Sequence, residues 1–397
     1  MRVPFGTITI APRSIELINE SLRSQRLSSG ALVQQFEEKF AQLVGVKEAV
    51  AVSTGTAADE IMTTVLHDLG ARYGDEIIVP ALTFVSSANA VLHAGFKPVF
   101  VDVDQSTFCV DPEKIEAVIT PKTRAIMAVN LMGKMADYEK IYDIANQYHL
   151  YVLEDAAESH MAKYKGRLAG SLGLLGAFST YIAHQISTGP QGGVITTNNP
   201  ELAEICRSLR QHGRNCACHS CLLNKDPGAY CAKRFAPGYD IRFTYNRIGY
   251  SAKMGEFEAA LGLGSLDNLD TVVEKRYQNL KYLMENWSQF SKYLWTLQES
   301  PYEVMGAHAF AIILNKDAPF TRDEFSTYLE QHGVETRVIF PTIPLTKAYR
   351  NIGYSNQAFP VSQYLSDYGI HIGCHQNLER EHLDYILTVV AEFIRCH

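Results

Sequence analysis

The chain has 397 residues and a formal net charge of −7; 46% of its residues are hydrophobic and 20% are charged. This composition is that of a soluble globular protein, and the length favours one large domain joined to a smaller one. The acidic balance, without a basic block, argues against a nucleic-acid-binding protein. The first residues lack the apolar core of a signal peptide, and no apolar run long enough to span a membrane follows. We therefore expect a cytoplasmic protein.

Short apolar runs rich in β-branched residues alternate with helical patterns between about residues 30 and 200. The runs cover residues 48–54, 75–82, 97–104, 123–133 and 150–158. Strands separated by helices of this length indicate βαβ units and a parallel sheet, and their continuous apolar character indicates burial on both faces. The sequence therefore predicts an α/β large domain, which we assign to residues 1–250.

The remainder of the chain is expected to leave this domain and form a second one. Apolar residues at helical spacing predict a connecting helix over residues 251–290. A smaller α+β domain then spans residues 291–397, with strands at 308–314 and 334–340 and helices at 321–333 and 380–396.

The first motif is a turn between a strand and a helix. Residues 52–60 place Ser53, Thr54, Gly55 and Thr56 there, where free N–H groups and the helix dipole favour a phosphate. The alternative is that the hydroxyls only cap the helix.

Two further positions are suited to hold an aromatic cofactor. Within residues 150–158, Glu154 and Asp155 end the apolar strand, and a carboxylate there can keep a heteroaromatic nitrogen protonated. Phe84 can cover the face of a bound ring. Read singly, Asp155 is as compatible with a helix cap, and Phe84 with a core residue.

The third motif is the loop within residues 176–197, which reads as strand, polar loop with glycines, and strand. This is a common frame for an active-site nucleophile, and a lysine would make chemical sense at its centre. The residue there is His184, in the stretch YIAHQIS.

Taken together, these motifs give the chain a family resemblance. Over residues 28–58, 79–104, 152–179 and 333–340 it resembles the DegT/DnrJ/EryC1/StrS family of nucleotide-sugar aminotransferases, in the family's order and spacing. The resemblance covers nearly the whole sequence. It implies a fold-type I pyridoxal-phosphate enzyme, similar to aspartate aminotransferase, with a mainly parallel seven-stranded sheet in the large domain. It also implies a homodimer whose active sites are shared between the two chains.

The resemblance assigns roles to the residues of the motifs. The implied contacts with pyridoxal or pyridoxamine phosphate are Gly55, Thr56 and Ser179 at the phosphate, Phe84 over the ring, Asp155 at the pyridine nitrogen, Glu158 near the ring hydroxyl and Ser251 at the phosphate of the neighbouring subunit. Two of these positions depart from the family. Glu158 stands where a glutamine is usual, and Ser251 replaces the asparagine of the family's Gly-Tyr-Asn.

His184 occupies the slot in which the aminotransferases of the family carry the lysine that binds the cofactor covalently. An imidazole can move protons but cannot form a Schiff base, so pyridoxamine phosphate becomes the natural resting form. A small branch of the family, the sugar 3-dehydratases, has histidine here. The resemblance to that branch implies that His184 is the general base in removing the C3 hydroxyl of a nucleotide-linked 4-keto-6-deoxyhexose.

Four cysteines, Cys216, Cys218, Cys221 and Cys231, fall within sixteen residues of an insertion over residues 212–240. In a reducing compartment such a cluster is more typical of a metal site than of disulfides. The insertion resembles that of iron–sulfur CDP-6-deoxy-4-hexulose 3-dehydrases, in which three ligands match Cys216, Cys218 and Cys231. The fourth ligand of those enzymes corresponds to Ala157 here, so we take Cys221 as its replacement and His219 as a further candidate.

The functional hypotheses differ in which metal the four cysteines bind and in whether the protein is catalytic. Four thiolates suit an iron–sulfur cluster or a tetrahedral zinc, and the cluster is favoured because it can carry electrons. The leading hypothesis is a dehydratase with an iron–sulfur cluster of open nuclearity, supplied by an external iron–sulfur flavin reductase. The second is a dehydratase recharged by glutamate, with structural zinc. The third is a non-catalytic homologue that dimerises with an active aminotransferase.

Overall fold

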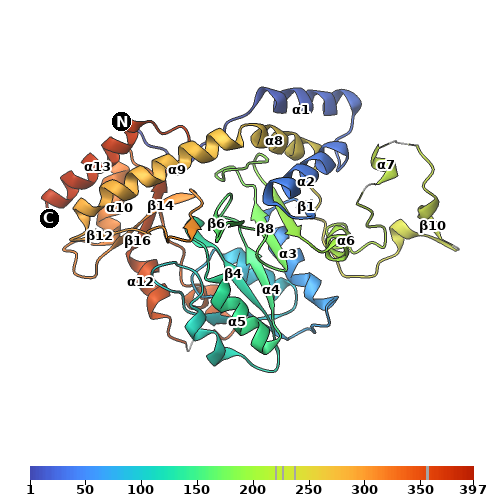
Figure 1. Cartoon of the computed structure of the whole chain (residues 1–397), viewed down its shortest axis with the longest axis horizontal. Coiled ribbons are helices and arrows are strands. Elements are labelled where there is room, and N and C mark those ends of the chain that lie inside the picture. The colour runs from blue at the N-terminus through green and yellow to red at the C-terminus, as the bar shows by residue number, and fades with distance from the viewer. Residues whose placement is uncertain (220, 226–227, 237, 355–356) are drawn as a thin grey trace.

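The structure, a computed structural model, describes residues 1–219, 221–225, 228–236, 238–354 and 357–397. Its centre is a seven-stranded sheet in the order β1-β9-β8-β5-β4-β2-β3 (Figure 1). The strands are β1 Glu48–Val52, β9 Gly193–Thr197, β8 Leu175–Ser179, β5 Tyr151–Asp155, β4 Thr123–Val129, β2 Glu76–Pro80 and β3 Lys97–Val101. Strand β9 is antiparallel to its neighbours and the others are parallel, which confirms the predicted mainly parallel sheet.

Both faces of this sheet are buried, as its apolar strands predict. In β1, Val50 and Val52 face one core while Ala49 and Ala51 face the other. The first core is covered by α3 Gly55–Thr64, α4 Val85–His93 and α6 Pro200–Leu209, and the second by α2 Ala31–Val44, α5 Tyr138–Tyr148 and α8 Glu256–Asp267. Within the described residues, no helix has both the length and the apolar character needed to cross a membrane.

A second, antiparallel sheet forms near the C-terminus in the order β12-β14-β16-β15. Its strands are β12 Leu294–Trp295, β14 Ala309–Leu314, β16 Gly369–Gly373 and β15 Thr336–Val338. The helices of this part are α10 Arg322–Gln331, α11 Lys347–Asn351, α12 Pro360–Tyr368 and α13 Arg380–Arg395. The strands and helices predicted here are thus confirmed. The first residues of the chain also lie on this sheet, because Val3 bridges to Val334.

The connection between the two sheets is not one continuous helix. Helix α8 ends before Asn268, whose backbone angles (φ −107°, ψ 7°) are not helical, and α9 Leu269–Asn286 follows directly. Helix α8 packs on α1 Pro12–Ser24 and on α2, whereas α9 packs on α13. The predicted single helix over residues 251–290 is therefore corrected to two, because each half follows a different core.

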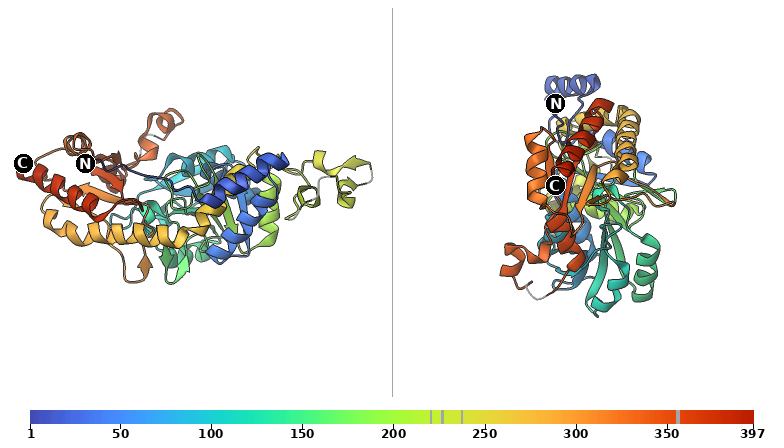
Figure 2. Two further views of the ribbon diagram at one scale, coloured as in Figure 1. Left: turned by 90° about the horizontal axis from the view of Figure 1, so that it is seen from above. Right: turned by 90° about the vertical axis from the view of Figure 1, so that its left-hand side faces the viewer.

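The cysteine segment projects from the body of the molecule (Figures 1 and 2). Its short elements are α7 Leu222–Lys225, β10 Phe235–Ala236 and β11 Tyr239–Asp240. Two antiparallel bridges, Gln211–Ser251 and Arg214–Tyr245, close the base of the segment. Residues 220, 226–227 and 237 of the predicted insertion lie outside the described residues.

A close contact joins the turn after β4 to the segment that leads into β14. Gly133 has a positive φ of 77°, and a side chain there would meet the carbonyl oxygen of Gly306 at 1.7 Å, so only glycine fits. Gly306 N–H donates to Gly133 O at 2.8 Å. Beside it, the ammonium of Lys134 pairs with the carboxylate of Glu303, and both side chains are almost fully buried.

We predict that Lys134→Met lowers the free energy of unfolding by about 3–5 kcal/mol, because it leaves the buried Glu303 carboxylate unpaired. Urea unfolding measures the change. The matched control is Lys140→Met, whose pair with Glu113 is 57% and 79% exposed. It should alter stability by less than about 0.5 kcal/mol. A change for Lys134→Met as small as that of the control would contradict the role of the buried pair.

Candidate active site

The candidate site lies where the parallel strands end. Asp155 is the last residue of β5 and Ser179 the last residue of β8, and these two strands pair in parallel. Asp155 is 4% exposed and accepts hydrogen bonds from Ser87 Oγ at 2.7 Å and from Ala157 N at 3.1 Å. Burial raises the pKa of Asp155, and no ion pair with a cationic side chain is found for it within the described residues. The carboxyl group is therefore suited to a cationic ligand.

The predicted phosphate turn is packed directly against β8. Thr54 caps α3 by accepting from Ala57 N at 2.9 Å, so the N–H groups of Gly55 and Thr56 keep no partner within the helix. A side chain at Gly55 would lie 2.6 Å from Cβ of Ser179. The structure thus brings Gly55, Thr56 and Ser179 together, and the capping and anion-binding interpretations are both compatible with it.

Phe84 stands at the start of α4 and is 52% exposed, with its ring 5.4 Å from that of Phe340 in an edge arrangement. The interpretation of Phe84 as a core residue is therefore wrong, and the side chain is accessible to a ligand. Its loop is tied to Asp155, because Thr83 Oγ1 lies 2.8 Å from Ser87 Oγ, which donates to that carboxylate.

Glu158 lies in the loop after β5, three residues beyond Asp155. Its Oε2 accepts from Met132 N at 2.8 Å, and its Oε1 lies 3.5 Å from Nε2 of His308. Burial, followed by the nearby charge of Asp155, raises the pKa of Glu158 to about 7. The carboxyl group can therefore gain or lose a proton near neutral pH.

His184 lies in the loop between β8 and β9. The loop is closed by Thr180 Oγ1 and Thr188 Oγ1, which are 2.6 Å apart. Nδ1 of His184 is buried and has no hydrogen-bond partner in the described part of the chain. Burial, and then the cation of Arg276, lowers the pKa of His184 to about 4. The imidazole is therefore neutral at physiological pH and can accept a proton.

Three histidines gather at this point, of which the sequence predicted only one. The ring of His184 lies 5.1 Å from that of His308 and 5.8 Å from that of His160. Arg276, from α9, holds the segment of His308 in place by donating to the carbonyls of Ala307 at 2.9 Å and His308 at 3.0 Å. His160 follows Glu158 by two residues, so its proximity to the site could have been predicted from the sequence. His308 and Arg276 are distant in sequence from the motifs and could not.

A second carboxyl group missed from the sequence is Asp59, on α3. It is 2% exposed, accepts from Ser86 Oγ at 3.2 Å, and its Oδ1 has no partner among the described residues. Burial and the neighbouring Asp155 raise its pKa well above the usual value. A carboxyl group in mid-helix gives no sequence signal of its own.

In the described part of the chain, Ser251 has no recorded contact with the other residues of the candidate active site. It is exposed and bridges to Gln211 at the base of the cysteine segment, while the adjacent Ala252 accepts from Ser53 N at 2.9 Å. Its predicted role at the phosphate of a neighbouring subunit stays a prediction.

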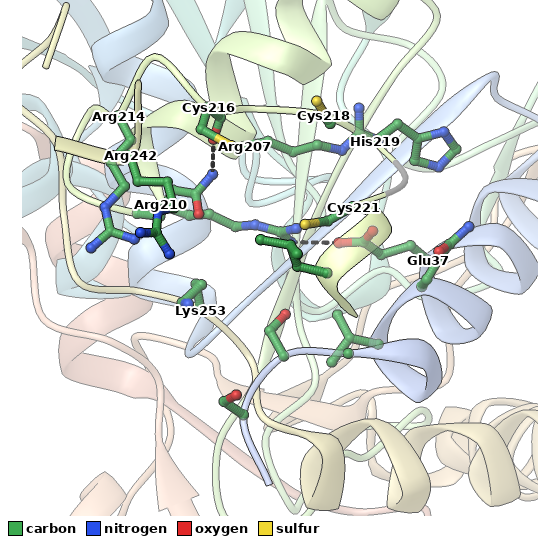
Figure 3. A pocket seen from close by; sticks show the side chains of 17 residues that line it. Glu37, Arg207, Arg210, Arg214, Cys216, Cys218, His219, Cys221, Arg242 and Lys253 are labelled. Carbon is green, nitrogen blue, oxygen red and sulfur yellow. Dashed lines mark hydrogen bonds and ion pairs between the residues drawn. The ribbon is translucent and has the colours of Figure 1, made fainter. Parts of the chain in front are cut away.

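Three of the four clustered thiols, Cys216, Cys218 and Cys221, line one pocket (Figure 3). The pocket is also lined by five cationic side chains, which are Arg207, Arg210, Arg214, Arg242 and Lys253. Burial, followed by the charges of the other three thiols, raises the pKa of Cys216. Among the described residues, no group of three or more Cys, His, Asp or Glu side chains is arranged to hold a metal ion. The predicted metal site therefore stays a prediction, with Cys231 as its fourth thiol.

Comparison with known proteins decides the family. Residues 9–391 match the model of the DegT/DnrJ/EryC1/StrS aminotransferase family. The chain belongs to this family.

Relatives within the DegT/DnrJ/EryC1/StrS family include both dehydratases and aminotransferases. The chain is 31% identical to the dTDP-4-dehydro-2,6-dideoxy-D-glucose 3-dehydratase of Saccharopolyspora spinosa, covering 98% of this chain and 86% of that protein. It is also 31% identical to the GDP-perosamine synthase of Escherichia coli O157:H7, covering 98% of each. The structure of E. coli GDP-4-keto-6-deoxy-D-mannose-3-dehydratase with bound hydrated PLP superposes with a TM-score of 0.86, at 28% identity over 98% of this chain and 99% of that one. The similarity confirms the fold-type I architecture.

We predict that His184 stays neutral down to about pH 5 and that it makes the protein less stable in acid. Its pKa of about 4 in the folded chain lies below the ordinary 6.5, so the unfolded chain binds the proton more readily. Stability is therefore present above about pH 6.5 and is lost as pH falls toward 4, by up to about 3 kcal/mol for this group. Unfolding at several pH values should show a weaker acid dependence for His184→Asn. The exposed His149→Asn should retain the dependence of the unmodified protein.

Proposed function

We propose that the protein is a pyridoxamine-phosphate-dependent dehydratase that removes the C3 hydroxyl of a nucleotide-linked 4-keto-6-deoxyhexose, with an iron–sulfur cluster as electron carrier. The observation that carries the proposal is His184: a neutral imidazole with an unpartnered, buried Nδ1 in the family's lysine slot. Membership of a family with 3-dehydratases among its relatives supports it.

The residues present fit the cofactor. The turn at Gly55 and Thr56 has free N–H groups and packs against Ser179 at the end of β8, which suits a phosphate, and the exposed Phe84 ring suits stacking. Asp155 is a buried carboxyl group without a cationic side chain beside it, which suits a protonated pyridine nitrogen. When bound, the cofactor supplies a protonated aromatic ring that accepts electrons from the reacting carbon.

His184 acts in this scheme as the general base. A base works best in its unprotonated form close to the atom that loses the proton, and the low pKa of His184 keeps the imidazole unprotonated at neutral pH. The proton that His184 takes up can then be returned to the departing hydroxyl, which leaves as water. Because an imidazole forms no covalent link with the cofactor, non-covalent contacts of Phe84, Asp155, Glu158 and the phosphate turn must hold it.

The thiols supply the second half of the reaction. Replacing a C3 hydroxyl by hydrogen consumes two electrons and two protons and releases one water molecule. Cys216, Cys218, Cys221 and Cys231 would hold a cluster that passes the electrons singly from an external iron–sulfur flavin reductase. The cations around the pocket of Figure 3 can offset the negative charge of a thiolate-bound cluster, which supports this assignment.

The assembly and setting follow from the same scheme. The active form would be a homodimer in which Ser251 reaches the phosphate bound by the neighbouring subunit, and the enzyme would act in the cytoplasm. Recharging by glutamate with zinc at the cysteines remains the second candidate, favoured by the structural similarity to the GDP-4-keto-6-deoxy-D-mannose-3-dehydratase.

We predict that His184→Asn lowers kcat for dehydration by about 10²–10⁴-fold, because the proton acceptor is lost while the cofactor contacts remain. Anaerobic assays with pyridoxamine phosphate, dithionite-reduced reductase and dTDP-, GDP- or CDP-linked 4-keto-6-deoxyhexoses measure the 3-deoxy product by mass spectrometry. His149→Asn is the control, since His149 is exposed and its φ of 55° suits asparagine. Undiminished turnover by His184→Asn would rule out the proposed base.

We predict that anaerobically purified protein contains iron and absorbs visible light that dithionite bleaches. Cys221→Ser should lower the iron content at least twofold, because it removes the proposed fourth ligand. Cys396→Ser should not, because Cys396 is an exposed residue distant in sequence from the cluster. Metal analysis and absorption spectra measure both. A colourless protein with stoichiometric zinc, active with glutamate alone, would replace the redox scheme by the second candidate.

A further inference from the structure

Glu158, to which the proposed function gives only the task of holding the cofactor, contacts a second titratable group, His308, to which it gives no role. Their side chains are 12% and 9% exposed, and Oε1 of Glu158 lies 3.5 Å from Nε2 of His308. The two residues come from distant parts of the chain, the loop after β5 and the segment before β14. Their approach therefore depends on the tertiary fold.

Only one oxygen of Glu158 is free to interact with the histidine. Oε2 is already committed to the backbone N–H of Met132, at 2.8 Å. Oε1 therefore faces Nε2 of His308 at 3.5 Å, an ion-pair distance at which one proton between the two atoms is favourable and two protons or none are not. When Glu158 is ionised, the tautomer of His308 with its proton on Nε2, toward the carboxylate, is favoured. When Glu158 is protonated, its hydroxyl faces a bare Nε2, and the proton of the neutral ring moves to Nδ1.

The surroundings keep His308 neutral in both cases. Burial lowers its pKa well below the ordinary value, and the other groups that act in the same direction are His184, Arg276, His371 and His160. The group that changes charge is therefore Glu158, whose pKa burial and Asp155 raise to about 7. The ring of His308 is also next to that of His184, at 5.1 Å and 49° between planes.

We propose that His308 is a positioning residue that shares one proton with Glu158, and that its tautomer switches with the charge of Glu158. A proton on Oε1 of Glu158 can pass to Nε2 while the proton of Nδ1 is released on the side of the ring away from Glu158, so proton number is conserved. The pair is a buried proton reserve beside the unprotonated His184. Its use in the dehydration rests on the proposed function, but the pair itself does not.

The test is a nitrogen-15 NMR titration of histidine-labelled full-length protein, without cofactor, between about pH 5.5 and 8.5. His308→Asn identifies the signals of His308. We expect His308 to carry its proton on Nε2 at high pH and on Nδ1 at low pH, with a midpoint near 7 and no imidazolium form. A tautomer that stays constant over this range would overturn the proposal, and this outcome is decided in the unmodified protein alone.

Glu158→Gln provides the matched variant. Because Met132 N–H needs an acceptor, the new amide must turn its carbonyl oxygen toward Met132 and its NH₂ toward Nε2 of His308. His308 should then carry its proton on Nδ1 at every pH. A switch that persists in Glu158→Gln would also overturn the proposal. The control is His93→Asn, which removes a surface pair in which Nδ1 of His93 lies 2.6 Å from Glu60 and should leave the switch unchanged.

A separate measurement links the pair to catalysis. In the dehydration assay, Glu158→Gln should remove the change of kcat that has its midpoint near pH 7. If the tautomer switch is observed but the protein turns over no nucleotide sugar, the proposed function is contradicted and the proposal for Glu158 and His308 stands. Turnover whose pH profile is unchanged by Glu158→Gln would contradict the catalytic use of the reserve.

Discussion

The contact between the turn after β4 and the segment before β14 is the constraint on which the site depends. The Gly133 and Gly306 backbones touch because Gly133 has no side chain, and the buried pair of Lys134 and Glu303 stabilises the same contact. Met132 precedes Gly133 and His308 follows Gly306 by two residues, and they are the two partners of Glu158. A shift at the contact would therefore be transmitted directly to the carboxyl group, because packed interiors do not deform gradually.

The charge distribution of the site explains why its residues have such unusual protonation states. Carboxyl groups and imidazoles are buried together, while the nearby guanidinium of Arg276 is committed to backbone carbonyls. The carboxyl groups are thus pushed toward their neutral form and so are the histidines. The charge in such a site therefore comes mainly from its ligand. A pyridoxamine phosphate carries both signs, negative on the phosphate and positive on the protonated ring.

The sequence predicted the large sheet and most of the candidate site because the motifs sit at strand ends, where chain order and spatial order coincide. Asp155, Ser179 and the turn at Gly55 are of this kind. His308 and Arg276 could not be predicted, since they reach the site through the fold of the smaller sheet and of α9. The single helix predicted over residues 251–290 was wrong at Asn268, because apolar spacing is continuous across a position where the packing partner changes. Phe84 was ambiguous in the sequence, and its exposure rules out the core interpretation while its role over a cofactor ring stays a prediction.

The projecting cysteine segment has a consequence for how the protein is assembled. Within the described residues, the ion pairs of Arg234 and Arg242 with Asp240 lie inside the segment, while the bridges at Gln211 and Arg214 anchor it at one end. None of the strands of the seven-stranded sheet belongs to it. A segment anchored in this way can open without disturbing the sheet, so the α/β body can fold before the four thiols are brought together. Assembly of the proposed cluster would then be a late step in biogenesis, on an already folded chain.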